Sequence, residues 1–202
     1  MTRYLANQYE QYKSDIPEGQ DGPWCVEQFT VTEEDEKLER MRAAFSFGSR
    51  GRFVPAGTYT KLTRNGFLVM SDTPDEIGDH MYAFHQARGR VLVNGLGLGI
   101  FTKMVLNKPE VSRVVVVEIA LEVINLVGTH LKKQYGDRLI LVCDDALTWK
   151  PPKGAHYDVV WHDIWDDICI DNLESMKRLH RRYGRRCDWQ GSWCRERCEW
   201  LR

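Results

Sequence analysis

The feature that could do chemistry most directly is a run of three glycines at alternate positions: Gly95, Gly97 and Gly99. They follow a short apolar run that ends in Asn94, and the residues after them, 100–106, predict a helix. Glycine adopts backbone conformations that other residues avoid, so such a loop can turn tightly and approach a ligand closely. Amide N–H groups at the start of the helix would then meet polar groups of that ligand. The pattern indicates a strand, a ligand-binding loop and a helix in succession.

The spacing of these glycines separates two classes of ligand site. A dinucleotide fingerprint, Gly-x-Gly-x-x-Gly, would place its third glycine at position 100, where this chain has Ile100. The spacing here, Gly-x-Gly-x-Gly, instead resembles that of enzymes that bind S-adenosylmethionine (SAM) or its decarboxylated form. Since three glycines alone specify little, this interpretation depends on the residues that follow at fixed distances.

Acidic residues follow the next three predicted strands, at the ends where ligands sit in doubly wound parallel sheets. Glu118 ends the run 114–117, nineteen residues after Gly99, and an acidic residue at about this distance can accept hydrogen bonds from ribose hydroxyls. Asp145 follows the run 139–142, where a carboxylate can accept a hydrogen bond from an adenine amino group. The run 157–162 is followed by three more carboxylates: Asp163, Asp166 and Asp167. Acidic residues at the same place after three successive strands argue against the alternative that these loops are merely polar.

The carboxylates after the last of these strands, Asp163, Asp166 and Asp167, form the densest acidic cluster. Close carboxylates raise one another's pKa, and an ionised one can take a proton from an amine or hydroxyl acceptor. We predict catalytic or substrate-contacting roles for Asp163 and Asp166; the alternative is that one of the three caps the following helix. For His162 we favour a hydrogen-bonded core histidine over a catalytic base. Trp165 is equally compatible with stacking on a ligand ring and with packing in a lid.

With these motifs, the chain resembles the class I SAM-dependent methyltransferase superfamily over about residues 52–200. Within it, the chain is most similar to the spermidine-synthase-like branch and to uncharacterised methyltransferase-like proteins of actinobacterial phages. The resemblance implies SAM as the cofactor, catalysis by Asp163 and Asp166, and no metal. The cofactor-binding residues that it implies are Asn94, Gly95, Gly97, Gly99, Glu118, Ile119, Asp145, Ala146 and Asp163.

Two departures from the aminopropyltransferase pattern favour methyl transfer over polyamine chemistry. Asp163-Ile164-Trp165-Asp166 stands where aminopropyltransferases carry Asp-Ser-Ser-Asp, so the two carboxylates are kept and the pair between them is not. Leu96 and Leu98 occupy the variable slots of the glycine loop, where those enzymes place an acidic residue. The resemblance therefore implies a methyltransferase that acts on an unidentified acceptor. The alternatives are an aminopropyltransferase that uses decarboxylated SAM, and a non-catalytic binding module of the same fold.

Length and composition suit a compact intracellular protein. The chain has 202 residues, is 43% hydrophobic and carries a formal net charge of −1, which gives no general attraction to nucleic acid or membrane. No apolar run is long enough to span a membrane, and six scattered cysteines suit reduced thiols better than a disulfide scaffold. We expect a cytoplasmic protein, in the host cytoplasm if phage-encoded. Its expected partner is a small-molecule acceptor, and homodimer formation is left open.

The C-terminal segment is rich in basic residues, with tryptophans between them. The basic residues are Lys177, Arg178, Arg181, Arg182, Arg185, Arg186, Arg195, Arg197 and Arg202, and the tryptophans are Trp189, Trp193 and Trp200. We favour a solvated basic helix face with the tryptophans packed on the sheet. The alternative is a nucleic-acid site in which cations contact the backbone and aromatics stack on bases. The cysteine spacings in this segment match no strong zinc pattern.

The predicted elements that position these residues alternate strand and helix from residue 90 to 163, which implies a parallel sheet. A helix over 121–133 follows the second strand, and a long last helix over 171–183 ends at Gly184. One short strand around 187–189 and one terminal helix complete the chain. The expected fold is α/β, a doubly wound, mostly parallel Rossmann-like sheet with helices on both faces. We expect it to be truncated at the C-terminus and preceded by an N-terminal helix and β-hairpin.

The N-terminal third is predicted to contain less regular structure. Residues 1–28 read as an irregular arm, and Thr32 is a candidate cap for the helix that follows. Asn65-Gly66 between two β-prone runs predicts a hairpin. Thr73-Pro74-Asp75-Glu76 predicts a capping box that opens a helix ended by Gly89. We predict two units: an arm, helix and hairpin lid over 1–72, and a SAM-binding domain over 73–202.

Overall fold

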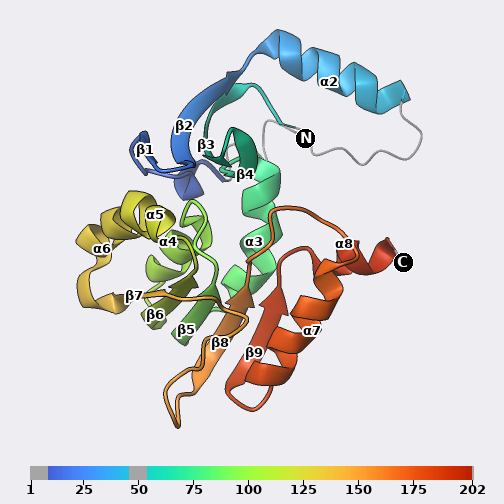
Figure 1. Ribbon diagram of the computed structural model, residues 1–202. Coiled ribbons are helices and arrows are strands. Elements are labelled where there is room, and N and C mark those ends of the chain that lie inside the picture. Colours follow the sequence, from blue (N-terminus) through green and yellow to red (C-terminus); the bar gives the residue numbers. More distant parts are fainter. Residues whose placement is uncertain (1–8, 46–53, 202) are drawn as a thin grey trace.

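A computed structural model of the protein describes residues 9–45 and 54–201. Its main layer is a five-stranded parallel sheet with the strand order β7-β6-β5-β8-β9 (Figure 1). The strands are β5 (Gly89–Asn94), β6 (Val111–Glu118), β7 (Leu139–Cys143), β8 (Tyr157–His162) and β9 (Cys187–Ser192). All four neighbouring pairs are parallel, which confirms the α/β fold class and each strand predicted from residue 90 onward.

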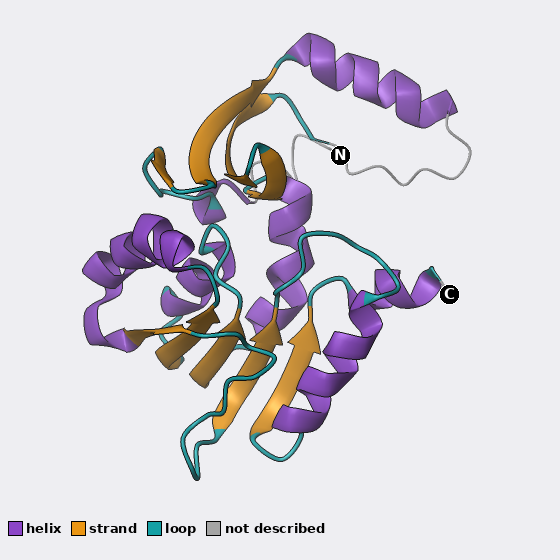
Figure 2. Ribbon diagram, viewed as in Figure 1, coloured by secondary structure: helices purple, strands orange, loops and turns teal. Residues whose placement is uncertain are grey.

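Helices cover both faces of this sheet (Figure 2). One face carries α3 (Pro74–Gln86), α4 (Ile100–Leu106) and the continuous helix made of α5 (Leu121–Val123), η2 (Ile124–Gly128) and α6 (Thr129–Tyr135). The other face carries α7 (Asn172–Tyr183), which is followed after β9 by α8 (Arg195–Trp200). Two short 3-10 turns are η1 (Glu10–Tyr12) and η3 (Gly136–Arg138).

Successive residues of the central strands point to opposite faces, as the pleat requires. Val91 and Val93 pack with α3 and α4, whereas Leu92 between them packs with Leu179 and Tyr183 of α7. All five side chains are essentially inaccessible to solvent. Apolar burial on both faces explains why these strands are continuous apolar runs in the sequence rather than alternating ones.

A second, antiparallel sheet with the order β1-β2-β3-β4 lies beyond the carboxyl ends of the parallel strands (Figure 1). Its strands are β1 (Gly19–Asp21), β2 (Trp24–Val31), β3 (Gly57–Arg64) and β4 (Phe67–Ser71). The prediction of an irregular arm over 1–28 was therefore wrong for residues 19–21 and 24–28. Gly22 and Pro23 interrupt the pattern there, but they form the turn between β1 and β2, and β2 then pairs with β3 along its whole length.

The β3–β4 hairpin is confirmed. Asn65 and Gly66 have φ angles of 52° and 79°, the left-handed conformation that a type I′ turn requires at both positions. The capping box at Thr73 is wrong: Thr73 precedes α3 as predicted, but its side chain makes no capping bond. Glu76 instead accepts a hydrogen bond from the main-chain N–H of Ser71, at 2.6 Å, which joins the helix to the end of β4. The helix also ends before Gly89, at Gln86.

The long helix α2 (Glu33–Phe45) projects away from both sheets (Figure 1). Thr32 caps it as predicted, because its hydroxyl oxygen accepts from the main-chain N–H of Asp35 at 3.1 Å. Leu38 and Met41 on this helix are each about half exposed. Within the described part of the chain, no helix is both long and apolar enough to cross a membrane.

Candidate functional site

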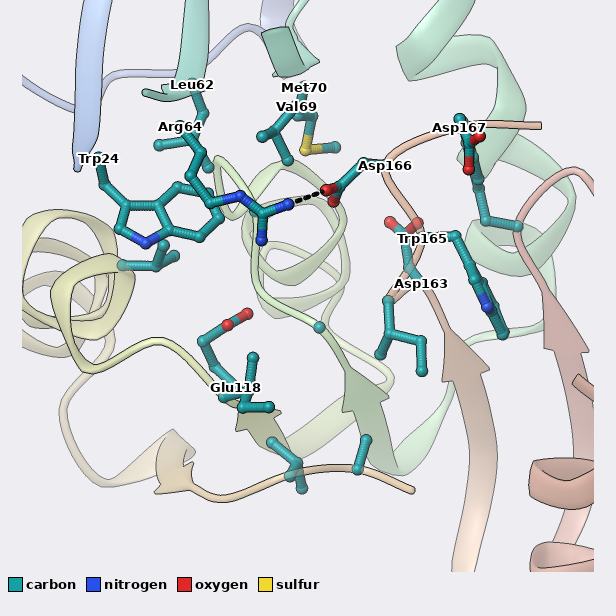
Figure 3. A pocket seen from close by; sticks show the side chains of 18 of the residues that line it. Trp24, Leu62, Arg64, Val69, Met70, Glu118, Asp163, Trp165, Asp166 and Asp167 are labelled. Carbon is teal, nitrogen blue, oxygen red and sulfur yellow. Dashed lines mark hydrogen bonds and ion pairs between the residues drawn. The ribbon is translucent and has the colours of Figure 1, made fainter. Parts of the chain in front are cut away.

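A cavity of about 610 Å³ lies between the antiparallel sheet and the carboxyl ends of the parallel strands (Figure 3). Its size is within the usual range for small-molecule sites. The parallel sheet contributes the end of β6 and the segments that follow β5, β7 and β8, and the antiparallel sheet contributes residues of β2, β3 and β4. The sequence-predicted residues that line it are Gly95, Gly97, Glu118, Ile119, Asp145, Ala146, Asp163, Trp165, Asp166 and Asp167.

The glycine loop shapes one wall of this cavity. Gly95 and Gly97 have φ angles of 94° and 51°, in the left-handed region that favours glycine. A Cβ at Gly95 would overlap the main-chain oxygen of Asp163, and one at Gly97 would press on the sulfur of Met70. Close approach of main chain therefore requires glycine at Gly95, whereas at Gly97 the flexible Met70 side chain could move and the positive φ is the stronger reason for glycine. Gly99 does not line the cavity; it begins α4, and a Cβ there would collide with Leu131.

The substitution Gly95→Ala should destabilise the protein. The new Cβ would need to displace the strand end that carries Asp163, and the left-handed φ adds strain of order 1–3 kcal/mol. Thermal unfolding of Gly95→Ala beside Gly66→Ala separates the two effects. Gly66 also has a positive φ, of 79° against 94° at Gly95, but a Cβ there would meet no atom within 4 Å. Equal losses of stability would show that close approach at Gly95 is unimportant.

Glu118 is held by the loop that it supports. Its side chain is 8% exposed, and its two oxygens accept hydrogen bonds from the main-chain N–H groups of Leu96, at 2.8 Å, and Ala120, at 2.9 Å. Burial raises the pKa of this carboxyl above its usual value. Each carboxylate oxygen can accept a second bond, so Glu118 can also accept from a hydroxyl in the cavity. The neighbouring Ile119 is exposed and lines the rim.

Arg182 of α7 holds the segment that follows β7 in place, a role that no sequence pattern indicated. Asp145 accepts a hydrogen bond from the N–H of Leu147 at 2.8 Å, and Ala146 is buried against the cavity. The guanidinium of Arg182 on α7 donates to the carbonyls of Ala146, at 2.8 Å, of Trp149, at 3.0 Å, and of Leu147. Nothing in the local sequence distinguishes Arg182 from the other arginines of α7.

The three carboxylates after β8 all line the cavity, but they differ in their partners. Asp166 forms an ion pair with Arg64 of β3, at 3.0 Å, which links the two sheets across the cavity mouth (Figure 3). Asp163 lies 3.9 Å from Nε2 of His80, a fully buried residue of α3 that no sequence pattern indicated. Neither aspartate caps the following helix, because α7 has Asp171 as its N-cap.

Asn94 and His162 lie in the core rather than in the cavity. The side-chain amide of Asn94 donates to Nδ1 of His162 at 2.7 Å, and Nε2 of His162 lies 3.3 Å from the side-chain oxygen Oε1 of Gln190. Both residues are inaccessible to solvent, which agrees with the preferred interpretation of His162 as a core histidine. Asn94 contributes to the site only through its main-chain oxygen, which accepts from the N–H of Asp163 at 2.7 Å.

His162 should make the protein sensitive to mild acid. Burial lowers its pKa from 6.5 to about 3, so below pH 6.5 the unfolded chain binds a proton that the folded protein does not. Stability from this group is complete above pH 6.5 and falls by about 1.4 kcal/mol per pH unit toward pH 3. Urea unfolding between pH 7 and pH 5 should therefore show a shallower pH dependence for His162→Gln than for the wild type. Parallel pH profiles for the two proteins would contradict this.

Trp165 lines the cavity, and a hydrogen bond to α7 fixes the orientation of its side chain. Its indole N–H donates to the hydroxyl of Ser175 on α7 at 2.9 Å, and its ring packs against the cluster of Leu173, Met176 and Cys198. Figure 3 draws the ring among the lining side chains that follow β8. The contact with α7 explains its orientation; stacking on a ligand ring stays a prediction.

The cavity is strongly acidic. Six carboxylate residues line it, and Arg64 is the one Lys or Arg among the described lining residues. The six are Glu76, Glu118, Asp145, Asp163, Asp166 and Asp167. A site with this balance favours a ligand that carries positive charge. Among the described residues, no group of three or more His, Cys, Asp or Glu side chains is arranged to hold a metal ion.

The comparisons with known proteins give a partial sequence match and several partial structural matches. No protein-family model matches the chain. A curated polyamine aminopropyltransferase 2 from Caldanaerobacter subterraneus is 34% identical over 108 residues, which are 50% of this chain and 36% of that protein. The match therefore spans little more than a third of the length of that relative. The phage resemblance stays a prediction.

Three solved structures illustrate the similarity of the fold. A spermidine synthase from Thermotoga maritima is 16% identical, with 81% of this chain and 53% of that chain covered and a TM-score of 0.46. An N-methyltransferase from Bradyrhizobium japonicum is 12% identical, with 56% and 61% covered and a TM-score of 0.42. A SAM-dependent methyltransferase from Clostridium acetobutylicum is 15% identical, with 56% and 44% covered and a TM-score of 0.41.

Proposed function

We propose that this protein is a transferase that binds SAM in the acidic cavity and transfers its methyl group to a small-molecule acceptor. The observation that carries the proposal is the composition of one cavity. The bare glycine loop, Glu118 and the Asp145–Ala146 segment line it together with Asp163 and Asp166. SAM carries a sulfonium cation, which suits the excess of carboxylates in the lining.

The residues of the chain fit this cofactor at three places. Gly95 and Gly97 line the cavity and carry no side chain, so their main-chain groups can meet the amino-acid part and the ribose. Glu118 has acceptor capacity for ribose hydroxyls, and the segment at Asp145 and Ala146, which lines the same cavity, would hold adenine. The cofactor would supply an already activated methyl group, so the protein mainly orients and desolvates the reactants.

The carboxylate of Asp163 is placed to hold the acceptor and to receive its proton. It faces the cavity with 17% of its side chain exposed, close to the glycine loop. The antiparallel sheet covers the same space through Trp24, Leu62 and Met70, which excludes water from the reactants. Arg64 and Asp166 would close the entrance by their ion pair.

Calorimetric titration of the protein with SAM and with S-adenosylhomocysteine tests the first step. We expect binding of both in the micromolar range, and then transfer of labelled methyl from SAM to a small-molecule fraction of a cell extract. Absence of binding of either compound at high micromolar concentration would refute the proposal. Binding without transfer to any fraction would identify a non-catalytic module instead.

A second candidate function is aminopropyl transfer from decarboxylated SAM to a polyamine. The curated relative favours it, as does the pair Asp163 and Asp166 in an acidic cavity that suits an amine. Leu96 and Leu98 count against it, because both are buried and the glycine loop presents no carboxylate of its own. Tighter binding of decarboxylated SAM than of SAM, with polyamine-dependent release of methylthioadenosine, would establish this alternative.

A further inference from the structure

The outer face of α7 carries a continuous stripe of positive charge. The helix buries Leu179 and Tyr183 against the sheet, and Leu173 and Met176 against Cys198 of α8. Opposite them, and in the turn after the helix, are Lys177, Arg178, Arg181, Arg182, Arg185 and Arg186, here called the basic stripe. Residues three or four positions apart are neighbours on a helix surface, so Lys177, Arg178, Arg181 and Arg182 lie together on α7, and Arg185 and Arg186 line the same hollow as the last two of them. The stripe is therefore a single surface rather than a scatter of charges.

The basic stripe borders a second hollow of about 600 Å³. Its lining is Gly154, Ala155, His156, Arg181, Arg182, Arg185 and Arg186. The hollow lies at the amino ends of β8 and β9, at the end of the sheet opposite the antiparallel layer (Figure 1). A ligand there would be separate from one in the acidic cavity.

The charges of the basic stripe are not neutralised within the described part of the chain, where no carboxylate forms an ion pair with any of the six residues. The nearest acid along the chain, Asp188, contacts Arg88 at 3.4 Å and His156 at 3.6 Å. Arg182 donates to three main-chain carbonyls, so its charge is fixed in place. Like charges held together repel, and a bound polyanion would relieve that repulsion.

The shape of the stripe favours a polymer. The four basic residues on α7, Lys177 to Arg182, extend about 7.5 Å along the helix axis, which matches about two steps of a nucleic-acid backbone, and Arg185 and Arg186 continue the charge in the turn. Two of the three nearby tryptophans are engaged elsewhere: Trp189 is stacked on Trp161, with ring centroids 6.4 Å apart, and Trp193 lines the acidic cavity. The basic residues themselves offer contacts to phosphates rather than to bases.

We propose that the basic stripe binds the phosphate backbone of nucleic acid without regard to sequence. This partner goes beyond the proposed transfer reaction, which needs only the acidic cavity. Contacts between cations and phosphates release counterions, so the affinity should fall steeply with salt. Base stacking by the tryptophans is not part of this proposal, because two of the three are occupied elsewhere.

Fluorescence anisotropy with the full chain and two unrelated 20-base-pair DNA duplexes tests the proposal. We expect equal affinity for both duplexes at 50 mM salt and a log–log salt slope of several units. The double variant Arg181→Gln/Arg185→Gln should lower the slope by about two and the affinity about tenfold or more. The matched control, Lys37→Gln/Lys133→Gln, removes two exposed positive charges from α2 and α6 and should change neither.

Three results would overturn the proposal. The first is no binding of either duplex at 50 mM salt, and the second is an equal loss of affinity in the control variant. The third is displacement of the duplex by micromolar inorganic tripolyphosphate, which would indicate a site for a small anion. Thermal unfolding of both variants checks that they are folded. Because Arg181 and Arg185 do not line the acidic cavity, SAM binding by the double variant should be unchanged whether or not the transferase proposal holds.

Discussion

The substitution Glu118→Gln should weaken binding of SAM by about ten- to a hundredfold, the equivalent of the 1.5–3 kcal/mol that a hydrogen bond to a charged group contributes. Glu118 accepts from the N–H groups of Leu96 and Ala120 and keeps acceptor capacity for ribose. Glutamine would turn an NH₂ group toward one of these N–H donors, so the variant would lose both an acceptor and the charge.

Calorimetry with SAM measures this effect directly. The matched control is Glu110→Gln, at an exposed position just before β6 and outside the cavity lining, where the same change should leave affinity unaltered. Thermal unfolding shows whether Glu118→Gln is still folded at the temperature of titration. A folded variant that binds SAM as tightly as the wild type would show that Glu118 serves only the glycine loop.

The sequence predicted the half of the site that depends on local pattern. A strand that ends in glycines, followed by acidic residues at the ends of the next strands, specifies its own geometry, because parallel strands present their carboxyl ends at one edge. Gly95, Glu118, Asp145 and Asp163 meet in one cavity for this reason. The hairpin at Asn65 was equally local, since its turn depends on two adjacent residues.

The other half depends on contacts between segments far apart in the chain. The pair Arg64–Asp166 joins positions 102 residues apart, and Arg182 reaches carbonyls of another loop more than thirty residues away. Neither contact belongs to a repeating pattern of residues, so the periodicity of the sequence could not predict it. The strand β2 was not predicted because glycine and proline commonly end regular secondary structure. Here Gly22 and Pro23 form a turn between two paired strands of the sheet.

Asn94 shows how a correct local pattern can mislead about a side chain. It stands at the end of β5, directly before the glycine loop, where a role in binding is expected. The pleat instead directs its amide into the core, to His162 on the adjacent strand. The alternation of side chains along a strand therefore decides which residues at a strand end can touch a ligand.

The substitution Asp163→Asn should slow methyl transfer by about a hundred- to ten-thousandfold, the usual contribution of a general base. Affinity for SAM should stay within a few-fold. The reason is that the main chain of Asp163, not its side chain, supports the site. Its N–H donates to Asn94, and its carbonyl lies where a Cβ on Gly95 would be. Asparagine keeps those contacts and the shape, and removes only the charge.

Asp167→Asn is the matched control, since Asp167 lines the same cavity and loses the same charge. If general acidity of the cavity is what matters, both variants should slow the reaction alike; if Asp163 receives the proton, only the first should. Single-turnover rates with labelled SAM distinguish these results, and calorimetry gives the affinity of each variant. The two-residue comparison also tests the placement of the cofactor. Loss of SAM binding by Asp163→Asn as severe as that of Glu118→Gln would move Asp163 from the acceptor side of the cavity to the cofactor side.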